Sequence, residues 1–330
     1  MRLSERFPRF RGNRSRSTDG TGSGGTIGRV IGLILLVYLL ICLLVGWYWS
    51  QEPDLDELNV LPVGAGQELT TGSHTARTLH SLVAVLLDKP GGFISNDIAP
   101  PGIWLDNMPS WEFGVLVQVR DMTRAMRRDM ARSQSQSTED PDLAKAEPLF
   151  HFDHNSWALP ASEREYRTGL RLLGNYITRL ESGNASFYAR ADNLAGWIGD
   201  ASTRMGSLSQ RLSASVARVP LTDGGRERKR TPWMEIDNVF YEARGSAWAM
   251  VHLLRAVERD YADVLANKNA LVSLRQIIRE LEATQAPMWS PVILNGGGFG
   301  IFANHSLVMA NYLSRANAGL IDLRRLLEQG

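Results

Sequence analysis

Residues 30–49 read VIGLILLVYLLICLLVGWYW, and this stretch decides the architecture of the chain. No charged residue stands between Val30 and Gln51. A helix of about 20 apolar or glycine residues is about 30 Å long, which matches the hydrocarbon core of a bilayer. We therefore predict a single transmembrane helix over residues 29–50, with residues 30–49 in contact with the lipid bilayer.

The charges on the two sides of this run differ in sign. Residues 1–29 contain seven arginines and two acidic residues, which gives a net charge of +5. Beyond the run, Arg77 is the first basic residue, and it is preceded by Glu52, Asp54, Asp56 and Glu57. Because positively charged flanks stay in the cytoplasm, the N-terminus is expected there and the rest of the chain on the other side. Trp47, Tyr48 and Trp49 are placed where an aromatic belt meets the far headgroups.

A cleavable signal peptide is the competing interpretation of the run. Signal peptides have a shorter apolar core and a small-x-small cleavage site, and this run is too long and lacks such a site after it. Cys42 follows Leu40 and Ile41, with no small residue before it as a lipoprotein signal requires. The sequence therefore favours an anchor that is kept.

The composition places the remaining residues in a globular class. The chain has 330 residues, 44% hydrophobic and 22% charged, with a formal net charge of +1. That composition argues against wholesale disorder and against a polytopic membrane protein. Residues 30–330 carry 29 basic and 33 acidic groups, so no nucleic-acid partner is expected. With Cys42 as the only cysteine, we expect no disulfide and no cysteine-based metal or nucleophile chemistry outside the run.

Hydrophobic periodicity predicts an all-α fold, with the transmembrane helix followed by a bundle of long amphipathic helices. Residues 1–28 are expected to be a disordered basic cytoplasmic tail, and residues 51–70 a spacer before a helical domain at 71–330. A packed loop is expected at 90–111, and the polar stretch 133–149 is expected to be a linker and an internal boundary. Ser162 and Glu165 resemble a capping box, and Gly183 and Asn184 are candidate helix breakers. The predicted helices cover about 71–88, 112–132, 162–219, 233–264, 271–281 and 304–327.

Catalytic and cofactor motifs are largely missing from the sequence. It contains no H-E-x-x-H, C-x-x-C, G-x-S-x-G or P-loop pattern. The glycine run at 295–300 lacks the third Rossmann glycine, since residue 301 is isoleucine, and too little chain follows it for a βαβ unit. A tight turn before the last helix is the simpler interpretation, and no cofactor is expected.

His151, Asp153 and His154 form the densest group of candidate metal ligands. Two imidazoles and a carboxylate suit zinc or a non-haem metal, provided that they converge on one point. Neighbouring residues rarely all face one point. The alternative is that this segment packs onto the bundle while its polar groups cap the helix that begins near Ser162.

The loop at 96–112 offers a different chemistry, with Asp97, Asp106 and Glu112 as candidate catalytic carboxylates. Paired carboxylates act as acid and base at glycosidic bonds, and the rings of Trp104 and Trp111 can stack on sugars. The structural alternative is that prolines shape the loop, tryptophans fix it to the core and Asx side chains make turns.

The helix at 112–132 has two chemically distinct faces. Arg120, Arg124 and Arg127, with Arg128 and Arg132, fall on one face at 100° per residue, and Met122, Met126 and Met130 fall on the other. We expect the methionines to point inward and the arginines outward. Arg120, Arg124 and Arg127 are thus candidate partner-binding residues for an acidic helix or for lipid headgroups, unless the face is simply solvated.

Three stretches carry a resemblance to a known family: GWYWSQEP at 46–53, KPGGFISNDIAPPGIWLDNMPSWEFG at 89–114 and LFHFDHNSWALPASEREYR at 149–167. They resemble a family of Gram-negative inner-membrane-anchored proteins, a domain of unknown function numbered twenty-three thirty-three. The resemblance extends from the anchor to the C-terminus. It implies a bacterial envelope protein, and it implies no reaction, ligand or catalytic residue.

Together these patterns favour a non-catalytic envelope scaffold or interaction protein in the bacterial inner membrane, with another envelope protein as partner. The second hypothesis is a periplasmic module that binds or hydrolyses peptidoglycan with the 96–112 loop. A third, metal-dependent hypothesis centres on His151, Asp153 and His154.

Overall fold

The structure is a computed structural model that describes residues 23–56, 58, 60, 69–133, 137–215, 231–288, 290, 292–295 and 303–329. It divides into two compact units, residues 1–44 and residues 45–330. We call the second unit the body.

Helix α1 (Ser23–Trp49) makes up the described part of the first unit and continues into the first residues of the body. Its stretch Ile27–Trp49 has a mean hydropathy of 2.9, long and apolar enough to cross a membrane. The helix begins at Ser23, so residues 23–28, expected in a disordered tail, are helical. The rest of that tail lies outside the described residues.

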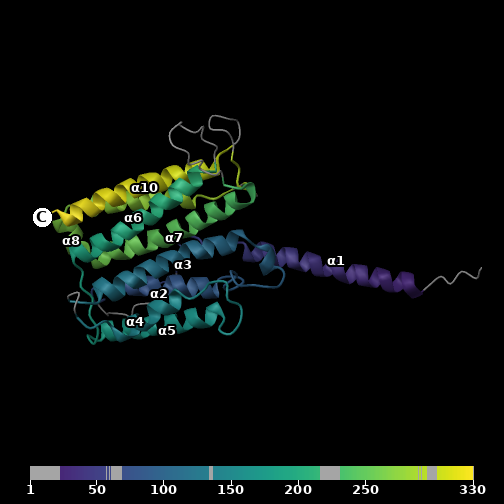
Figure 1. Ribbon diagram of the computed structural model, residues 1–330, viewed down its shortest axis with the longest axis horizontal. Coiled ribbons are helices and arrows are strands. Elements are labelled where there is room, and N and C mark those ends of the chain that lie inside the picture. Colours follow the sequence, from purple (N-terminus) through teal and green to yellow (C-terminus); the bar gives the residue numbers. More distant parts are fainter. Residues whose placement is uncertain are drawn as a thin grey trace, which may run out of the picture. The chain divides into compact units, whose positions relative to one another are not determined.

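The body consists of helices packed side by side. In Figure 1, α6 (Ala191–Ser213) and α10 (His305–Glu328) form one side, α7 (Ile236–Asp260) and α3 (Asn107–Ala125) form the middle, and α2 (Ser73–Asp88), α4 (Pro141–Phe150) and α5 (Ser162–Glu181) form the other side. The remaining helices are α8 (Ala262–Asn267) and α9 (Leu271–Glu282). Within the described ranges there is no strand, only one isolated bridge between Asn295 and Asn304. The prediction of an all-α chain with an N-terminal apolar helix and a helical bundle is confirmed.

Two local features differ from the sequence-based prediction. The stretch 133–149, predicted to be a linker, contains α4, because the Asp140 carboxylate accepts hydrogen bonds from the amides of Asp142 (3.0 Å) and Leu143 (3.2 Å) and Pro141 opens the helix. The capping box at Ser162 is wrong. Ala161 is the N-cap, and the Ser162 hydroxyl donates instead to the carbonyl oxygens of Asp153 (2.7 Å) and Ser156 (2.9 Å).

Other predicted boundaries agree more closely. The helical stretch predicted at 162–219 breaks near Gly183, as expected. The φ of Gly183 is +77°, in the left-handed region that glycine tolerates. α3 begins at Asn107 and ends in a π-helical turn, Met126–Met130. Residues 216–219, predicted to end the helix that contains α6, lie outside the described residues.

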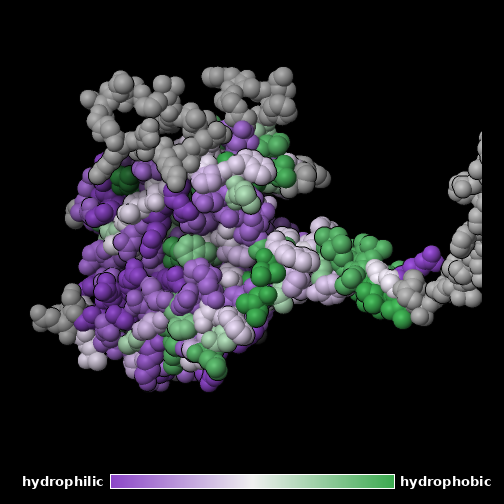
Figure 2. All heavy atoms as spheres, turned by 45° about the vertical axis from the view of Figure 1, so that its right-hand side comes forward, coloured by the Kyte–Doolittle hydropathy of each residue, from purple (hydrophilic) through white to green (hydrophobic). Residues whose placement is uncertain are grey.

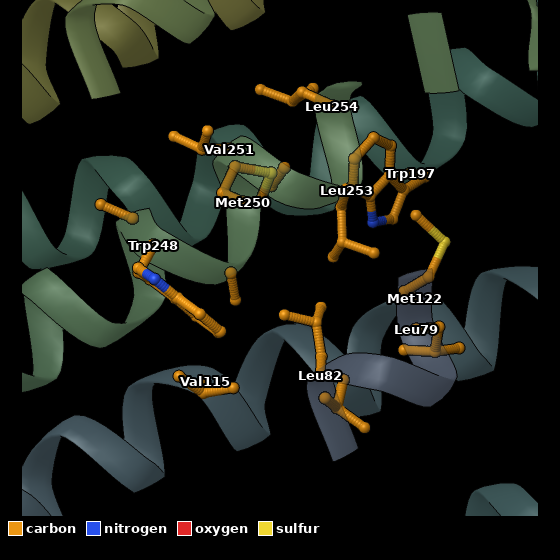
Figure 3. Close-up of a cluster of buried hydrophobic side chains, with 14 of the residues drawn as sticks. Leu79, Leu82, Val115, Met122, Trp197, Trp248, Met250, Val251, Leu253 and Leu254 are labelled. Carbon is orange, nitrogen blue, oxygen red and sulfur yellow. The ribbon is translucent and has the colours of Figure 1, made fainter. Parts of the chain in front are cut away.

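The core of the body is centred on α7. Trp111 of α3, Trp197 of α6 and Trp248 of α7 are essentially inaccessible to solvent. Figure 3 shows Trp248 lying over Val115 of α3, and Trp197 next to Met122 and Leu253. The rings of Trp111 and Trp248 are 5.2 Å apart, a distance typical of interacting aromatic pairs. One continuous hydrophobic core therefore holds helices from residue 76 to residue 327 together.

The N-terminus of α2 is capped from a distant part of the chain. Asp260, at the end of α7, accepts hydrogen bonds from the amides of Gly72 (2.9 Å) and Thr75 (2.6 Å) and from the Thr75 hydroxyl (2.7 Å). A carboxylate at a helix N-terminus satisfies free amides and complements the helix dipole. This contact ties the start of the body to the end of its central helix.

Candidate functional site

The predicted catalytic residue Glu112 is part of a buried ion pair. Its carboxylate lies 2.6 Å from the ammonium of Lys89, and the two side chains are 0% and 1% exposed. It also accepts hydrogen bonds from the amides of Ile94 (2.9 Å) and Ser95 (2.9 Å) and from the Ser95 hydroxyl (2.5 Å). With both oxygens occupied and no exposed surface, Glu112 is placed to hold the loop after α2 rather than to meet a substrate.

Asp97 lies in the same loop, close to this ion pair. Burial raises the pKa of the Asp97 carboxyl, the negative charges of Glu112 and Glu163 raise it further, and Lys89 opposes them. Its side chain packs directly against Gly102, where a Cβ would collide with it. The neighbouring Asn96 donates to the Ser156 carbonyl (2.9 Å) and to Glu163 (2.7 Å). The loop after α2 is therefore joined to the segment between α4 and α5.

Asp106 is separated from the other two predicted carboxylates. It is exposed and lines a cleft of about 190 Å³ at the start of α3, together with Asp237, Tyr241 and Trp233. Burial raises the pKa of the Asp237 carboxyl, and the charge of Asp106 raises it further. Sequence reasoning missed Asp237, because no motif links it to Asp106. Only the packing of α7 against α3 brings the pair together.

The three predicted metal ligands do not converge. His151 accepts a hydrogen bond from Arg124 at Nε2 (2.7 Å) and donates from Nδ1 to the Glu147 carbonyl (3.0 Å). The ring of His154 stacks on Phe113 at 4.9 Å, and burial lowers its pKa. Asp153 accepts from the Asn155 amide (3.0 Å) in a turn. No group of three or more His, Cys, Asp or Glu side chains suited to a metal occurs among the residues that were described.

Three arginines of the predicted face, Arg120, Arg124 and Arg127, contact other parts of the chain, whereas Arg128 is exposed. Arg120 donates to the carbonyl oxygens of Phe150 (2.7 Å) and Phe152 (2.9 Å). Arg124 and Arg127 pair with Glu147 of α4 at 3.4 Å and 2.9 Å. On the opposite face the three methionines are fully buried, so their inward orientation is confirmed: Met122, Met126 and Met130. These arginines attach α4 and the loop after it to α3 and to the π-helical turn that follows α3.

The residues that follow the apolar run are built into the body. A Cβ on Gly46 would lie 3.4 Å from Pro101, and the ring of Trp49 packs on Gly91. Glu52 pairs with Arg244 of α7 at 2.5 Å, and Arg244 also donates to the Thr284 carbonyl (2.9 Å). Burial raises the pKa of Glu52, and Arg244 opposes the shift. The start of the predicted spacer is therefore a packed segment.

Two clefts flank this segment, with volumes of about 560 Å³ and 520 Å³. Glu52 and Asp54 line both clefts, Arg244 and Tyr241 line the first, and Lys89 lines the second. Sequence reasoning did not single out Arg244, because an arginine on a polar helix position carries no signal of its partner 192 residues away.

The fold and these sites define an all-helical bacterial protein. Its N-terminal helix is apolar enough to span a membrane, and a helical body follows it. The chain belongs to the family described as "Uncharacterized protein conserved in bacteria (DUF2333)", which matches residues 23–330. This agrees with the resemblance noted from the sequence. No curated protein and no solved structure matches the chain.

Proposed function

We propose that this chain is a single-pass protein of the bacterial inner membrane that displays its helical body in the periplasm as a non-catalytic interaction domain. The N-terminus lies in the cytoplasm, and residues 27–49 span the bilayer. The body binds another component of the envelope.

The packing of the end of α1 into the body carries the membrane part of this proposal. A signal peptidase that removed the apolar run through Trp49 would also remove the ring that packs on Gly91. Glu52, three residues further on, is held by Arg244. An uncleaved run leaves these contacts intact, and a bilayer would cover its exposed apolar side chains.

The internal pairing of charged residues supports a non-catalytic role. Glu112, Arg120 and Arg127 all have partners within the chain, and these contacts shape loops rather than open a site. Long helices with a continuous core present a stable surface for a partner.

One observation favours the alternative, a glycan-binding or glycan-cleaving module. The cleft of Asp106 and Asp237 combines two carboxylates with the exposed ring of Trp233.

The anchor is tested by following both ends of the full-length chain in a Gram-negative host. We expect an uncleaved chain that stays in alkali-washed membranes, with a C-terminal tag that protease reaches only after the outer membrane is opened. Leu36→Arg should weaken insertion, because an arginine at a helix centre costs about 2.5–3.5 kcal/mol. Val272→Arg, at a side chain 76% exposed on the body, is the matched control. A soluble chain that has lost the run, or a cytoplasmic C-terminal tag, would contradict the proposal.

The interaction role is tested by native mass spectrometry of the full-length protein extracted gently from its own membranes. We expect a stoichiometric partner subunit. A bare monomer would contradict an interaction role. A monomer that carries a glycan fragment would move the function to the Asp106 cleft, and Asp106→Asn or Asp237→Asn should then remove the fragment while leaving the fold intact.

A further inference from the structure

The described tryptophans of the body differ in their exposure, and Trp49 is partly buried. Trp111, Trp197 and Trp248 are buried in the core. Four described tryptophans are instead more than half exposed: Trp47 (69%), Trp104 (53%), Trp157 (62%) and Trp233 (83%). Exposed indole rings are costly to leave in water, and they are enriched where one side of the ring meets an apolar phase and the other meets water.

All four exposed tryptophans lie at the same end of the body. Figure 1 shows that the connections from α2 to α3 and from α4 to α5, and the start of α7, are at one end of the helix bundle. Contacts join these connections to one another. Asn96 donates a hydrogen bond of 2.9 Å to the carbonyl oxygen of Ser156, the residue before Trp157. Trp233 shares a cleft with Asp106. Gly46, next to Trp47, lies against Pro101. We call this surface the aromatic end.

Aliphatic side chains extend the aromatic end. Ile98 and Ile103 are 57% and 56% exposed in the loop of Trp104. Leu159 is 97% exposed, with a φ of +50°, a conformation that costs energy for a leucine. Figure 2 has this end turned toward the viewer, and green hydrophobic groups interrupt the purple surface there. Nothing in the described chain covers Leu159, so its position is not explained by packing within the body.

We propose that the aromatic end docks on the outer leaflet of the membrane, with Ile103, Trp104, Trp157 and Leu159 inserted at the headgroup boundary. The inference rests on the proposed membrane anchor. The occupant is lipid because this surface is continuous with the last turn of the apolar helix at residues 45–49, so an anchored body holds it next to the bilayer. Tryptophans together with single exposed aliphatic side chains match the composition of surfaces that bind at a membrane–water interface.

The docking is tested with spin labels on the full-length chain in lipid nanodiscs. In a Cys42→Ser background, single labels are placed at Ile103→Cys and Leu159→Cys. The control is Val272→Cys, at an apolar side chain that is 76% exposed at the start of α9, five residues after the end of α8. Figure 1 shows α8 at the other end of the helix bundle. Leu36→Cys reports on the anchor itself. Relative accessibility to oxygen and to a polar nickel complex gives the depth of each label.

We expect the labels at 103 and 159 to lie about 5–10 Å inside the headgroup boundary, as interfacial helices do, and the label at 272 to be in water. If label 36 lies in the hydrocarbon while labels 103 and 159 match label 272, the docking is wrong and the anchor stands. If label 36 is also in water, the anchor itself fails. Labels 103 and 159 that are shielded in native membranes but exposed in pure lipid would assign the surface to a protein partner and overturn the proposal.

Circular dichroism checks that each labelled chain keeps its helix content. Because the substituted side chains at 103, 159 and 272 are all more than half exposed, the fold is expected to tolerate them. A further variant, Leu159→Glu, should move a label at 103 toward water if both residues share one lipid contact. An unchanged depth at 103 would count against a shared contact.

Discussion

Replacing Gly245 by alanine is expected to lower the free energy of unfolding by about 3 kcal/mol, the upper range for overpacking a core. A Cβ at Gly245 of α7 would collide with the carbonyl oxygen of Trp111 and lie 3.0 Å from its Cα. On the facing helix, a Cβ at Gly114 would collide with the carbonyl oxygen of Glu242. Each glycine thus admits the backbone of the opposite helix, and neither backbone can move aside as a flexible side chain would.

The matched control for this prediction is Gly196→Ala on α6. No atom lies within 4 Å of the position where its Cβ would be, so alanine should raise helix stability by up to about 1 kcal/mol. Urea unfolding of the full-length chain, followed by circular dichroism, measures both variants. If Gly245→Ala were as stable as Gly196→Ala, α3 and α7 could not be packed as closely as described.

Glu112→Gln is expected to destabilise the body by about 3–5 kcal/mol, because removing one partner of a buried ion pair leaves the other charge uncompensated. The Lys89 ammonium would remain 1% exposed, with the Gly92 carbonyl at 2.6 Å as its remaining close partner. The loop amides of Ile94 and Ser95 would also lose a charged acceptor. The effect is therefore on folding and not on a chemical step.

The double variant Lys89→Met with Glu112→Gln serves as the control. It should recover part of the lost stability, since no charge then remains buried without a partner. Urea unfolding of the two single variants and the double variant gives the coupling energy of the pair. A Glu112→Gln chain with unchanged stability that has lost an envelope activity would instead support the catalytic interpretation of Glu112.

Helix positions were largely predictable, and the exceptions have local causes. α2 ends at its predicted boundary and α5 ends close to the predicted break at Gly183. Both were predictable because apolar spacing and glycine act on neighbouring residues of the chain. α4 was missed because the polar stretch before it hid the signal of Asp140 and Pro141. The start of α2 is capped by Asp260, and no local pattern shows a cap that comes from another helix.

The candidate sites were less predictable than the helices. Asp97, Asp106 and Glu112 lie within one loop and its following helix, yet Glu112 pairs with Lys89 and Asp106 shares a cleft with Asp237. Trp104 and Trp111 are seven residues apart in the same stretch, and one is 53% exposed while the other is fully buried. Residue type alone indicated that these side chains matter, without indicating what they contact.

The sequence by itself determined that this chain has one apolar helix of membrane-spanning length and an all-helical body, because hydropathy and periodicity are properties of neighbouring residues. Only the tertiary structure decided which charges are paired, which tryptophans are exposed and that Trp49 packs on Gly91. These contacts join residues far apart in the chain, and their energies depend on distance and burial. Both quantities exist only once α2, α3, α4 and α7 have packed together.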